Sequence, residues 1–184
     1  TMKKVAVLLA DGFEEIEALT VVDILRRASV YVDTVSITDE YKVRGLHGIN
    51  VQTEDLFDEV NFVEFDMIVL PGGMPGTTNL DEHPGVKRVV EDYVTSGKYV
   101  AAICAAPSIL GGMGLLKGKR AACYPSVEDK LSGAVISRLP VVQDGNIITS
   151  RGMGTAIDFA LKLTEILFDR EQAEELAASI IYDL

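Results

Sequence analysis

The sequence of 184 residues has few of the residues on which several classes of protein depend. It contains two cysteines and two histidines, too few for a disulfide scaffold or a zinc framework. Lysine and arginine number 17 against 28 acidic residues, and the resulting net charge of -11 argues against nucleic acid or an anionic membrane as a partner. Glycine-rich nucleotide motifs and HExxH are also absent, so we expect no cofactor and no metal.

Long apolar runs are missing as well. No run approaches the roughly 18 residues of a membrane span, and the first residues lack the layout of a signal peptide. We therefore expect a cytoplasmic protein whose two cysteines are free thiols. The remaining composition, 48% apolar and 24% charged, is typical of globular proteins. The length favours one domain over residues 1–184.

Short apolar segments alternate with longer segments of helical periodicity, and this pattern predicts an α/β protein with a mainly parallel sheet. The predicted strands are 4–10, 32–38, 66–70, 99–103, 120–124 and 146–150, and helices are predicted to begin near Phe13, His83, Pro107, Met153 and Glu171. Asp144-Gly145 lies between two apolar runs and predicts a hairpin. Ligands bind beyond the carboxyl ends of strands in such sheets, so the residues that follow each strand are the candidates.

Cys104 directly follows the strand predicted at 99–103, and Pro107 fits the first turn of a helix after it. This arrangement is that of a nucleophile elbow, in which a helix N-terminus would lower the thiol pKa below about 8.5. The alternative is a buried structural cysteine, which is common. Cys123 has no helix directly after it, and we interpret it as structural. Strand alternation would place Cys123 and Tyr124 on opposite faces.

Asp11 and Glu14 have the spacing of a capping box at the start of a helix. Glu17 then falls on the apolar side of that helix, four residues after Phe13 and four before Val21. Burial raises the pKa of a carboxyl group, and a carboxyl that holds a proton near neutral pH can act as a general acid or base beside a thiolate. The alternative is a carboxylate buried without a function.

Gly72 and Gly73 follow the strand predicted at 66–70 and permit close backbone approach. Amides at this turn, together with the amide of Ala105, could face a developing oxyanion. A glycine pair after a strand is also simply a common tight turn. His47 and His83 fall in predicted loops, and we interpret both as solvent-exposed loop residues.

Four segments of the chain together resemble the ThiJ/PfpI superfamily, and specifically its DJ-one branch. They are VAVLLADGFEEIEALTVVDILRRA, DMIVLPGGMPGTTNL, AAICAAPSIL and IITSRGMGTAIDFAL. The resemblance implies a flavodoxin-like three-layer α/β/α sandwich and usually a homodimer. It also implies a reactive Cys104, a protonated Glu17 in contact with the thiolate, and amides of Gly73 and Ala105 that face the sulfur. The residues it implies as lining or supporting the site or the dimer interface are Gly72, Tyr124, Asp23, Arg26, Arg27, Ser150 and Arg151.

One position departs from the family pattern. The family's histidine near the cysteine stands before a proline, and here Tyr124 stands before Pro125. Tyrosine has a pKa of about 10 against about 6.5 for histidine, so Tyr124 cannot replace it as a base at neutral pH. His47 aligns where some members have a basic residue, which makes it a candidate for supporting the site.

The resemblance implies an enzyme acting on small reactive carbonyls or glycated adducts, either a glutathione-independent glyoxalase or a protein deglycase. Cys104 would add to the aldehyde, and Glu17 would move a proton between carbons. The alternative is a sensor or chaperone of oxidative stress, in which Cys104 is oxidised to a sulfinic acid. A cysteine peptidase or amidotransferase-like hydrolase is a third possibility, which Tyr124 disfavours.

Overall fold

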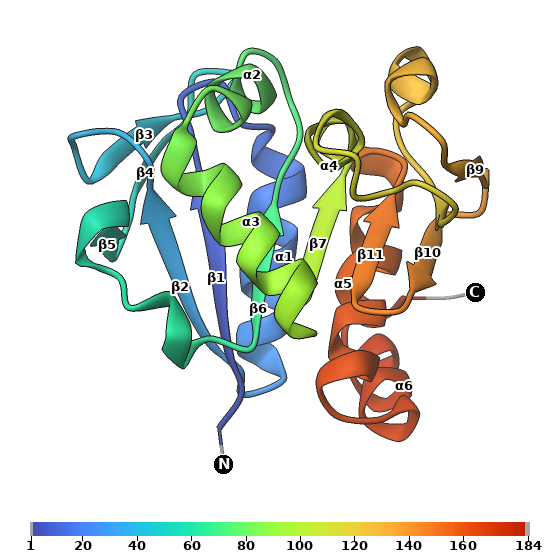
Figure 1. Ribbon diagram of the computed structural model, residues 1–184. Coiled ribbons are helices and arrows are strands. Elements are labelled where there is room, and N and C mark those ends of the chain that lie inside the picture. The colour runs from blue at the N-terminus through green and yellow to red at the C-terminus, as the bar shows by residue number, and fades with distance from the viewer. Residues whose placement is uncertain (1, 183–184) are drawn as a thin grey trace.

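A seven-stranded sheet lies between two layers of helices (Figure 1). The computed structural model describes residues 2–182. In their order across the sheet, the strands are β10 (Val141–Asp144), β11 (Ile147–Ser150), β7 (Tyr99–Ile103), β6 (Met67–Leu70), β1 (Lys4–Leu9), β2 (Tyr31–Ser36) and β5 (Asp55–Leu56). All neighbours pair in parallel except β10 and β11, which form the predicted hairpin. The predicted α/β class and flavodoxin-like sandwich are thereby confirmed.

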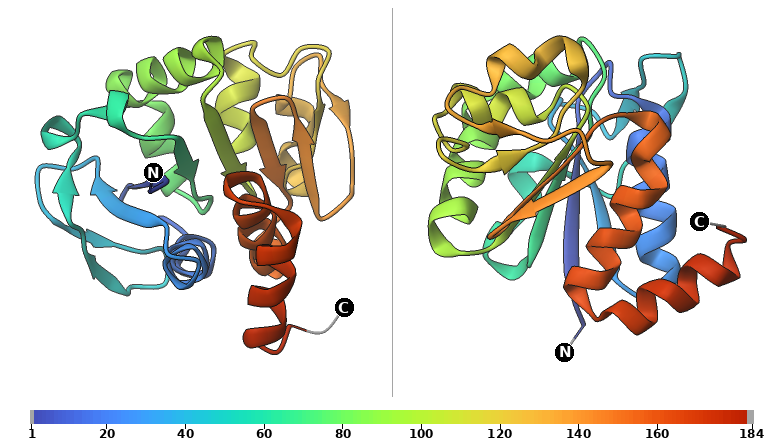
Figure 2. Two further views of the ribbon diagram at one scale, coloured as in Figure 1. Left: turned by 90° about the horizontal axis from the view of Figure 1, so that it is seen from below. Right: turned by 90° about the vertical axis from the view of Figure 1, so that its right-hand side faces the viewer.

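The two helical layers cover opposite faces of this sheet (Figure 2). One layer holds α1 (Glu15–Arg27) and α5 (Ala156–Leu167), with α6 (Arg170–Ser179) packed against α5. The other holds α2 (Gly76–Asp81), α3 (Pro84–Ser96) and α4 (Pro107–Gly112). Along β1, Val5, Val7 and Leu9 pack toward α1 and α5, whereas Ala6 and Leu8 pack toward the other layer. The strands are apolar on both faces because helices bury both faces.

Several short elements complete the structure. The strands β3 (Lys42–Arg44) and β4 (Asn50–Gln52) form a hairpin, and β8 (Arg120–Ala121) pairs with β9 (Val135–Ile136). Four 3₁₀ helices lie at Phe57–Glu59, Phe62–Glu64, Pro125–Lys130 and Met153–Thr155. Sequence periodicity did not predict β3, β4, β5, β9 or α2, because segments of two to six residues are too short to show a period. Within residues 2–182, no helix has the length and apolar character to cross a membrane.

The strand predicted over 120–124 is largely wrong. It ends at Ala121 and belongs to the small β8–β9 sheet. The amide of Ala122 donates to the Thr149 hydroxyl at 2.9 Å, and the amide of Tyr124 donates to the Cys104 carbonyl at 2.8 Å. These bonds replace a strand ladder and bring the segment over the end of β7.

The capping box predicted from Asp11 and Glu14 is also wrong. Glu14 is itself the N-cap of α1, and its carboxylate accepts the amides of Ile16 at 2.5 Å and Glu17 at 3.3 Å. Asp11 instead accepts the amide of Arg44 at 3.0 Å. Gly12, with φ of +87°, turns the chain between the two acids and delays the helix.

Candidate active site

Cys104 lies at the carboxyl end of β7, at the edge of the sheet where the parallel strands end (top of Figure 1). Its φ of +66° is in the left-handed region, which few residues other than glycine adopt. Hydrogen bonds on both sides hold this backbone: its amide donates to Ser150 at 3.0 Å, and its carbonyl accepts from Tyr124. The predicted tight turn between strand and helix is confirmed. Strain of this kind often accompanies a functional site.

Glu17 comes from the apolar side of α1 and is only 1% exposed. Its Oε1 accepts the amide of Gly72 at 2.9 Å. Its Oε2 is buried and makes no hydrogen bond with residues 2–182, and the Cys104 thiol lies close enough to affect the protonation of the carboxyl group. The carboxyl and the thiol therefore face each other inside the protein.

Gly72 allows this approach because it has no side chain. A Cβ at this position would lie 2.6 Å from Cys104 Cβ and 2.7 Å from Glu17 Oε1. Both distances are shorter than a van der Waals contact. Gly72 therefore serves the site in two ways, through its amide and through the space that it leaves.

The carboxyl and the thiol strongly affect each other's protonation. Burial raises the pKa of Glu17 to about 7, against a partial opposing effect of hydrogen bonds from Cys104 and Gly72. Burial and the adjacent Glu17 carboxylate raise the pKa of Cys104 to about 12, although the amides of Ala105 and Gly73 act to lower it. The prediction that the helix terminus lowers the thiol pKa is therefore wrong while Glu17 is ionised.

The same pair explains how a thiolate can form. If the proton moves from sulfur to Glu17, the negative charge that raises the thiol pKa is neutralised. The amides of Gly73 and Ala105 remain and favour the anionic sulfur. When Glu17 is ionised the pair holds one proton, and the raised thiol pKa keeps that proton on the sulfur until it is transferred to Glu17.

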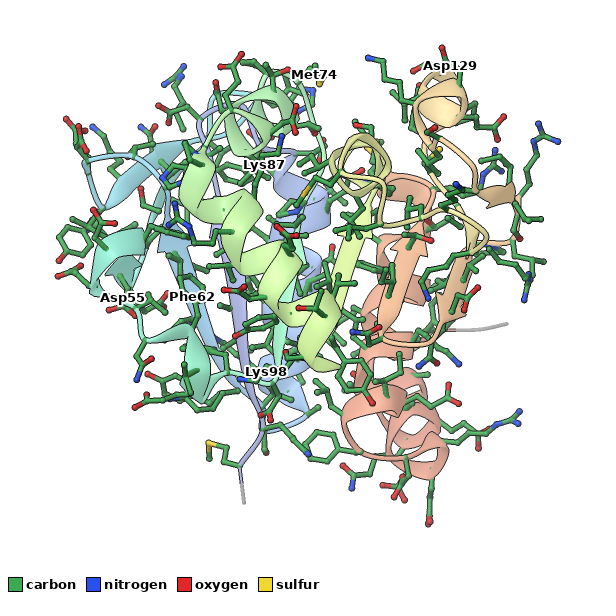
Figure 3. All side chains as sticks on the ribbon, viewed as in Figure 1. Asp55, Phe62, Met74, Lys87, Lys98 and Asp129 are labelled. Carbon is green, nitrogen blue, oxygen red and sulfur yellow. The ribbon has the colours of Figure 1, made fainter. Side chains whose placement is uncertain are left out.

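The Cys104 thiol opens onto a cleft of about 1110 Å³. Gly73, Ala105 and Ser108 line it near the sulfur, and Tyr124, with 49% of its surface exposed, lines one side. Met74 beside α2 and Asp129 in the 3₁₀ helix Pro125–Lys130 also line it and lie apart at the top of Figure 3. The arrangement brings a thiol, a buried carboxyl group and two backbone amides together beside one cleft.

Comparison with known proteins assigns this arrangement to a family. A model of the DJ-1/PfpI family matches residues 3–166. The chain belongs to the DJ-1/PfpI family. DJ-1 homolog B of Arabidopsis thaliana is 38% identical over an alignment of 183 residues, and the match covers 97% of this chain and 41% of the plant protein. The chain spans less than half the length of the two Arabidopsis relatives that it matches.

Two other members of the DJ-1/PfpI family match over most of both chains. The glutathione-independent glyoxalase DJR-1.2 of Caenorhabditis elegans is 34% identical over 165 residues, 89% of this chain and 87% of the nematode protein. The crystal structure of a cysteine-to-alanine mutant of a DJ-1 superfamily protein from Salmonella typhimurium superposes with a TM-score of 0.95. That protein is 39% identical, and the match covers 100% of both chains.

In this DJ-1/PfpI protein, some of the expected supporting residues lie away from the cleft. Asp23 and Arg27 form an ion pair on the surface of α1. Arg26 binds Glu54 at 2.7 Å and the carbonyl of Val32 at 2.9 Å, so it ties α1 to β2. None of the three lines the cleft.

Ser150 supports the turn at Cys104 from the end of β11, whereas Arg151 lines no part of the cleft. Ser150 is buried, and its hydroxyl donates to the Pro140 carbonyl at 2.7 Å and lies 2.7 Å from the Thr155 hydroxyl. Its own carbonyl accepts the amide of Cys104. The Arg151 charge acts to lower the pKa of Cys123, but burial outweighs it and raises that pKa to about 11. Cys123 is buried in the core, as the structural interpretation predicts.

Neither histidine lines the cleft. His83 caps α3, where its Nδ1 accepts the amide of Val86 at 3.1 Å. His47, whose side chain is 66% exposed, lies with Nδ1 3.2 Å from Glu15 Oε1 and 3.4 Å from Glu14 Oε1. These three groups are close enough to hold a metal ion, but backbone amides already bind both carboxylates.

Sequence reasoning missed the serine and threonine residues of the cleft, and Thr77 and Ser108 are two of them. Ser108 donates to the carbonyl of Ala105 at 2.6 Å and so stiffens the turn after the cysteine. Each residue lies in the first turn of the helix that follows a strand, Thr77 in the segment PGGMPGTT and Ser108 in the segment CAAPS. That position is the signal that could have identified them.

Proposed function

We propose that the protein is a glutathione-independent glyoxalase, which converts a 2-oxoaldehyde such as methylglyoxal to a 2-hydroxy acid. The observation that carries the proposal is the position of the Cys104 thiol, which lies between the Glu17 carboxyl and the amides of Gly73 and Ala105 at an open cleft. The identity with the nematode glyoxalase supports it. The cleft volume also admits the larger glycated adducts that a deglycase would take.

The reaction begins with the shared proton. Glu17 takes the thiol proton while the sulfur adds to the aldehyde carbon, and the amides of Gly73 and Ala105 stabilise the oxyanion that forms. Glu17 then gives its proton to that oxygen. The product of this step is a neutral hemithioacetal on Cys104, with Glu17 ionised again.

Glu17 next acts as a base on carbon. It removes the hydrogen from the carbon bound to sulfur, and this gives an enediolate. The hydroxyl proton passes from the first oxygen to the second, and Glu17 returns its proton to the neighbouring carbon. A thioester of the 2-hydroxy acid results, and water cleaves it to release the acid and restore the thiol. The sum is methylglyoxal plus water giving lactic acid.

The position of Tyr124 yields a prediction. A general base contributes about 100-fold to 10,000-fold to a rate, whereas a phenol is protonated at neutral pH and cannot supply this. We expect Tyr124→Phe to keep kcat/KM for methylglyoxal within about threefold of wild type in steady-state assays at pH 7. A loss of 100-fold would contradict the assignment of all proton transfers to Glu17.

The raised thiol pKa favours the enzyme over the alternative, a redox sensor. Oxidation of a cysteine follows the amount of thiolate in the resting protein, and Glu17 suppresses that amount. The enzyme needs the thiolate only as the sulfur attacks. Selective oxidation of Cys104 by mild peroxide, detected by mass spectrometry, would instead support the sensor.

We further propose a homodimer, as the family resemblance implies. Ile16, Ile49 and Ile157 are exposed and line one shallow apolar groove over α1 and α5. Burial of these side chains against a second copy would remove apolar surface from water. Light scattering is expected to give twice the 19.9 kDa mass of the chain, and a monomer mass would contradict the proposal.

The direct test of the function is product analysis. Purified protein is incubated with methylglyoxal in the absence of glutathione, and lactate is measured by NMR and by an enzyme-coupled assay. Stoichiometric lactate is expected. Loss of methylglyoxal without lactate would indicate adduct formation alone and would overturn the proposal.

A further inference from the structure

Thr77 lines the cleft, while its hydroxyl group is buried beside it without a hydrogen-bond partner among residues 2–182. The residue belongs to α2, is 4% exposed and lines the same cleft as Cys104. Its Oγ1 is buried and makes no hydrogen bond with any residue in the described range 2–182. A buried hydroxyl without a partner costs free energy, so a partner from outside the chain is a physical reason for it to be there.

The neighbouring hydroxyl groups differ from it. Ser108 is already bonded to the carbonyl of Ala105. Thr78 also lines the cleft, but it is not buried, and its hydroxyl lies 4.0 Å from the sulfur of Met74. Thr77 therefore combines burial, an unused hydroxyl and a place in the cleft wall.

One hydrogen bond links the backbone of Thr77 to the turn that faces the Cys104 sulfur. Its amide donates to the carbonyl of Gly73 at 2.8 Å, and the amide of Gly73 faces the Cys104 sulfur. The backbone of Thr77 is thus bonded to the residue whose amide faces the sulfur. Threonine in a helix populates two χ1 rotamers, and rotation between them exchanges the methyl group and the hydroxyl.

We infer that Thr77 binds the second oxygen of the substrate and selects 1,2-dicarbonyls over simple aldehydes; this inference rests on the proposed function. The amides of Gly73 and Ala105 account for the oxygen on the carbon that sulfur attacks. The oxygen on the adjacent carbon needs its own donor, and the Thr77 hydroxyl supplies it once rotation about χ1 turns it into the cleft. An aldehyde without this oxygen leaves the hydroxyl unpaired and binds less well.

The test measures how well two aldehydes protect Cys104 from alkylation. Wild type, Thr77→Val, Thr77→Ser and the matched control Thr78→Val are treated with iodoacetamide at increasing methylglyoxal or acetaldehyde, and modification of Cys104 is quantified by mass spectrometry. Thr77→Val is expected to raise the half-protecting concentration of methylglyoxal about tenfold, the effect of one lost hydrogen bond. Acetaldehyde protection is expected to stay unchanged. Thr77→Ser and Thr78→Val are expected to behave as wild type.

Denaturant unfolding separates a binding role from a structural one. Valine has the shape of threonine without its unpaired hydroxyl, so Thr77→Val is expected to unfold at the same or higher denaturant concentration. A lower denaturant midpoint for Thr77→Val, or an equal loss of protection by both aldehydes, would overturn the inference. If Thr77→Val does not fold, Thr77→Ala is used with the same criteria.

The outcome is separable from that of the proposed function, because protection reports addition to sulfur and not the later proton transfer. If Thr77→Val selectively weakens protection by methylglyoxal but wild type forms no lactate, the inference about Thr77 is upheld and the glyoxalase proposal is rejected. If wild type forms lactate but Thr77→Val has no selective effect on protection, the glyoxalase proposal is upheld and the inference about Thr77 is rejected. Failure of both aldehydes to protect wild-type Cys104 would reject both.

Discussion

Replacement of Cys104 by serine is expected to lower kcat/KM for methylglyoxal by about 1,000-fold or more, the size of effect seen when a nucleophile is removed. Serine keeps the shape of the side chain, but its hydroxyl loses a proton far less readily than a thiol. The Gly73 and Ala105 amides and Glu17 remain in place, so the loss reports the sulfur itself. Lactate formation at pH 7 is the measurement.

The second thiol of the chain provides a matched control for this experiment. Cys123 is buried in the core and lines no part of the cleft, so Cys123→Ser is expected to retain the activity of wild type. Both variants lose one thiol of the two in the chain. Retention of more than about a tenth of the activity by Cys104→Ser would show that methylglyoxal is consumed without a covalent intermediate.

Replacement of Glu17 by glutamine is expected to stabilise the protein at pH 8 while it removes activity. The pKa of Glu17 rises from 4.5 to about 7 on folding. The folded state therefore holds the proton more tightly than the unfolded state, so stability is greatest below pH 4.5 and falls as pH rises toward 7. Glutamine is neutral throughout and can still accept the amide of Gly72. The expected gain in unfolding free energy at pH 8 is about 3 kcal/mol.

Urea unfolding at pH 5 and pH 8 measures the gain in unfolding free energy of Glu17→Gln, which should be much smaller at pH 5.

Glu15 offers a control of opposite sign. Burial acts to raise the pKa of Glu15, but hydrogen bonds from backbone amides, including those of Ile49 and His47, lower it. Glu15→Gln is therefore expected to destabilise the protein at pH 8. A Glu17→Gln variant less stable than wild type at pH 8 would contradict the assigned pKa.

Loss of activity in Glu17→Gln has a separate cause. An amide cannot carry the proton between carbons, so lactate formation is expected to fall about 100-fold or more. The hemithioacetal can still form, since Cys104 and both facing amides remain. A variant that is more stable but less active than wild type would indicate that the buried carboxyl group serves activity at a cost in stability.

The elements that carry the two main residues of this site could be predicted from the sequence, because helix periodicity and turn residues are local features of the chain. The period of the helix places Glu17 on the apolar side of α1, and the exit from β7 into Pro107 places Cys104 at a tight turn. The hairpin at Gly145 follows from turn chemistry for the same reason. The six-residue α2 and the course of residues 122–124 were not predictable, because short segments show no period and their hydrogen bonds go to distant residues.

The chemistry itself depends on contacts between segments far apart in the chain. Only folding brings Glu17 and Cys104 together across Gly72, and only their proximity and burial reverse the expected lowering of the thiol pKa. The burial of Thr77 with an unused hydroxyl is likewise a result of packing. Residue types and periodicity thus single out Cys104 and Glu17 as the candidates, whereas the protonation of the pair depends on burial and charge, which arise only in the folded protein.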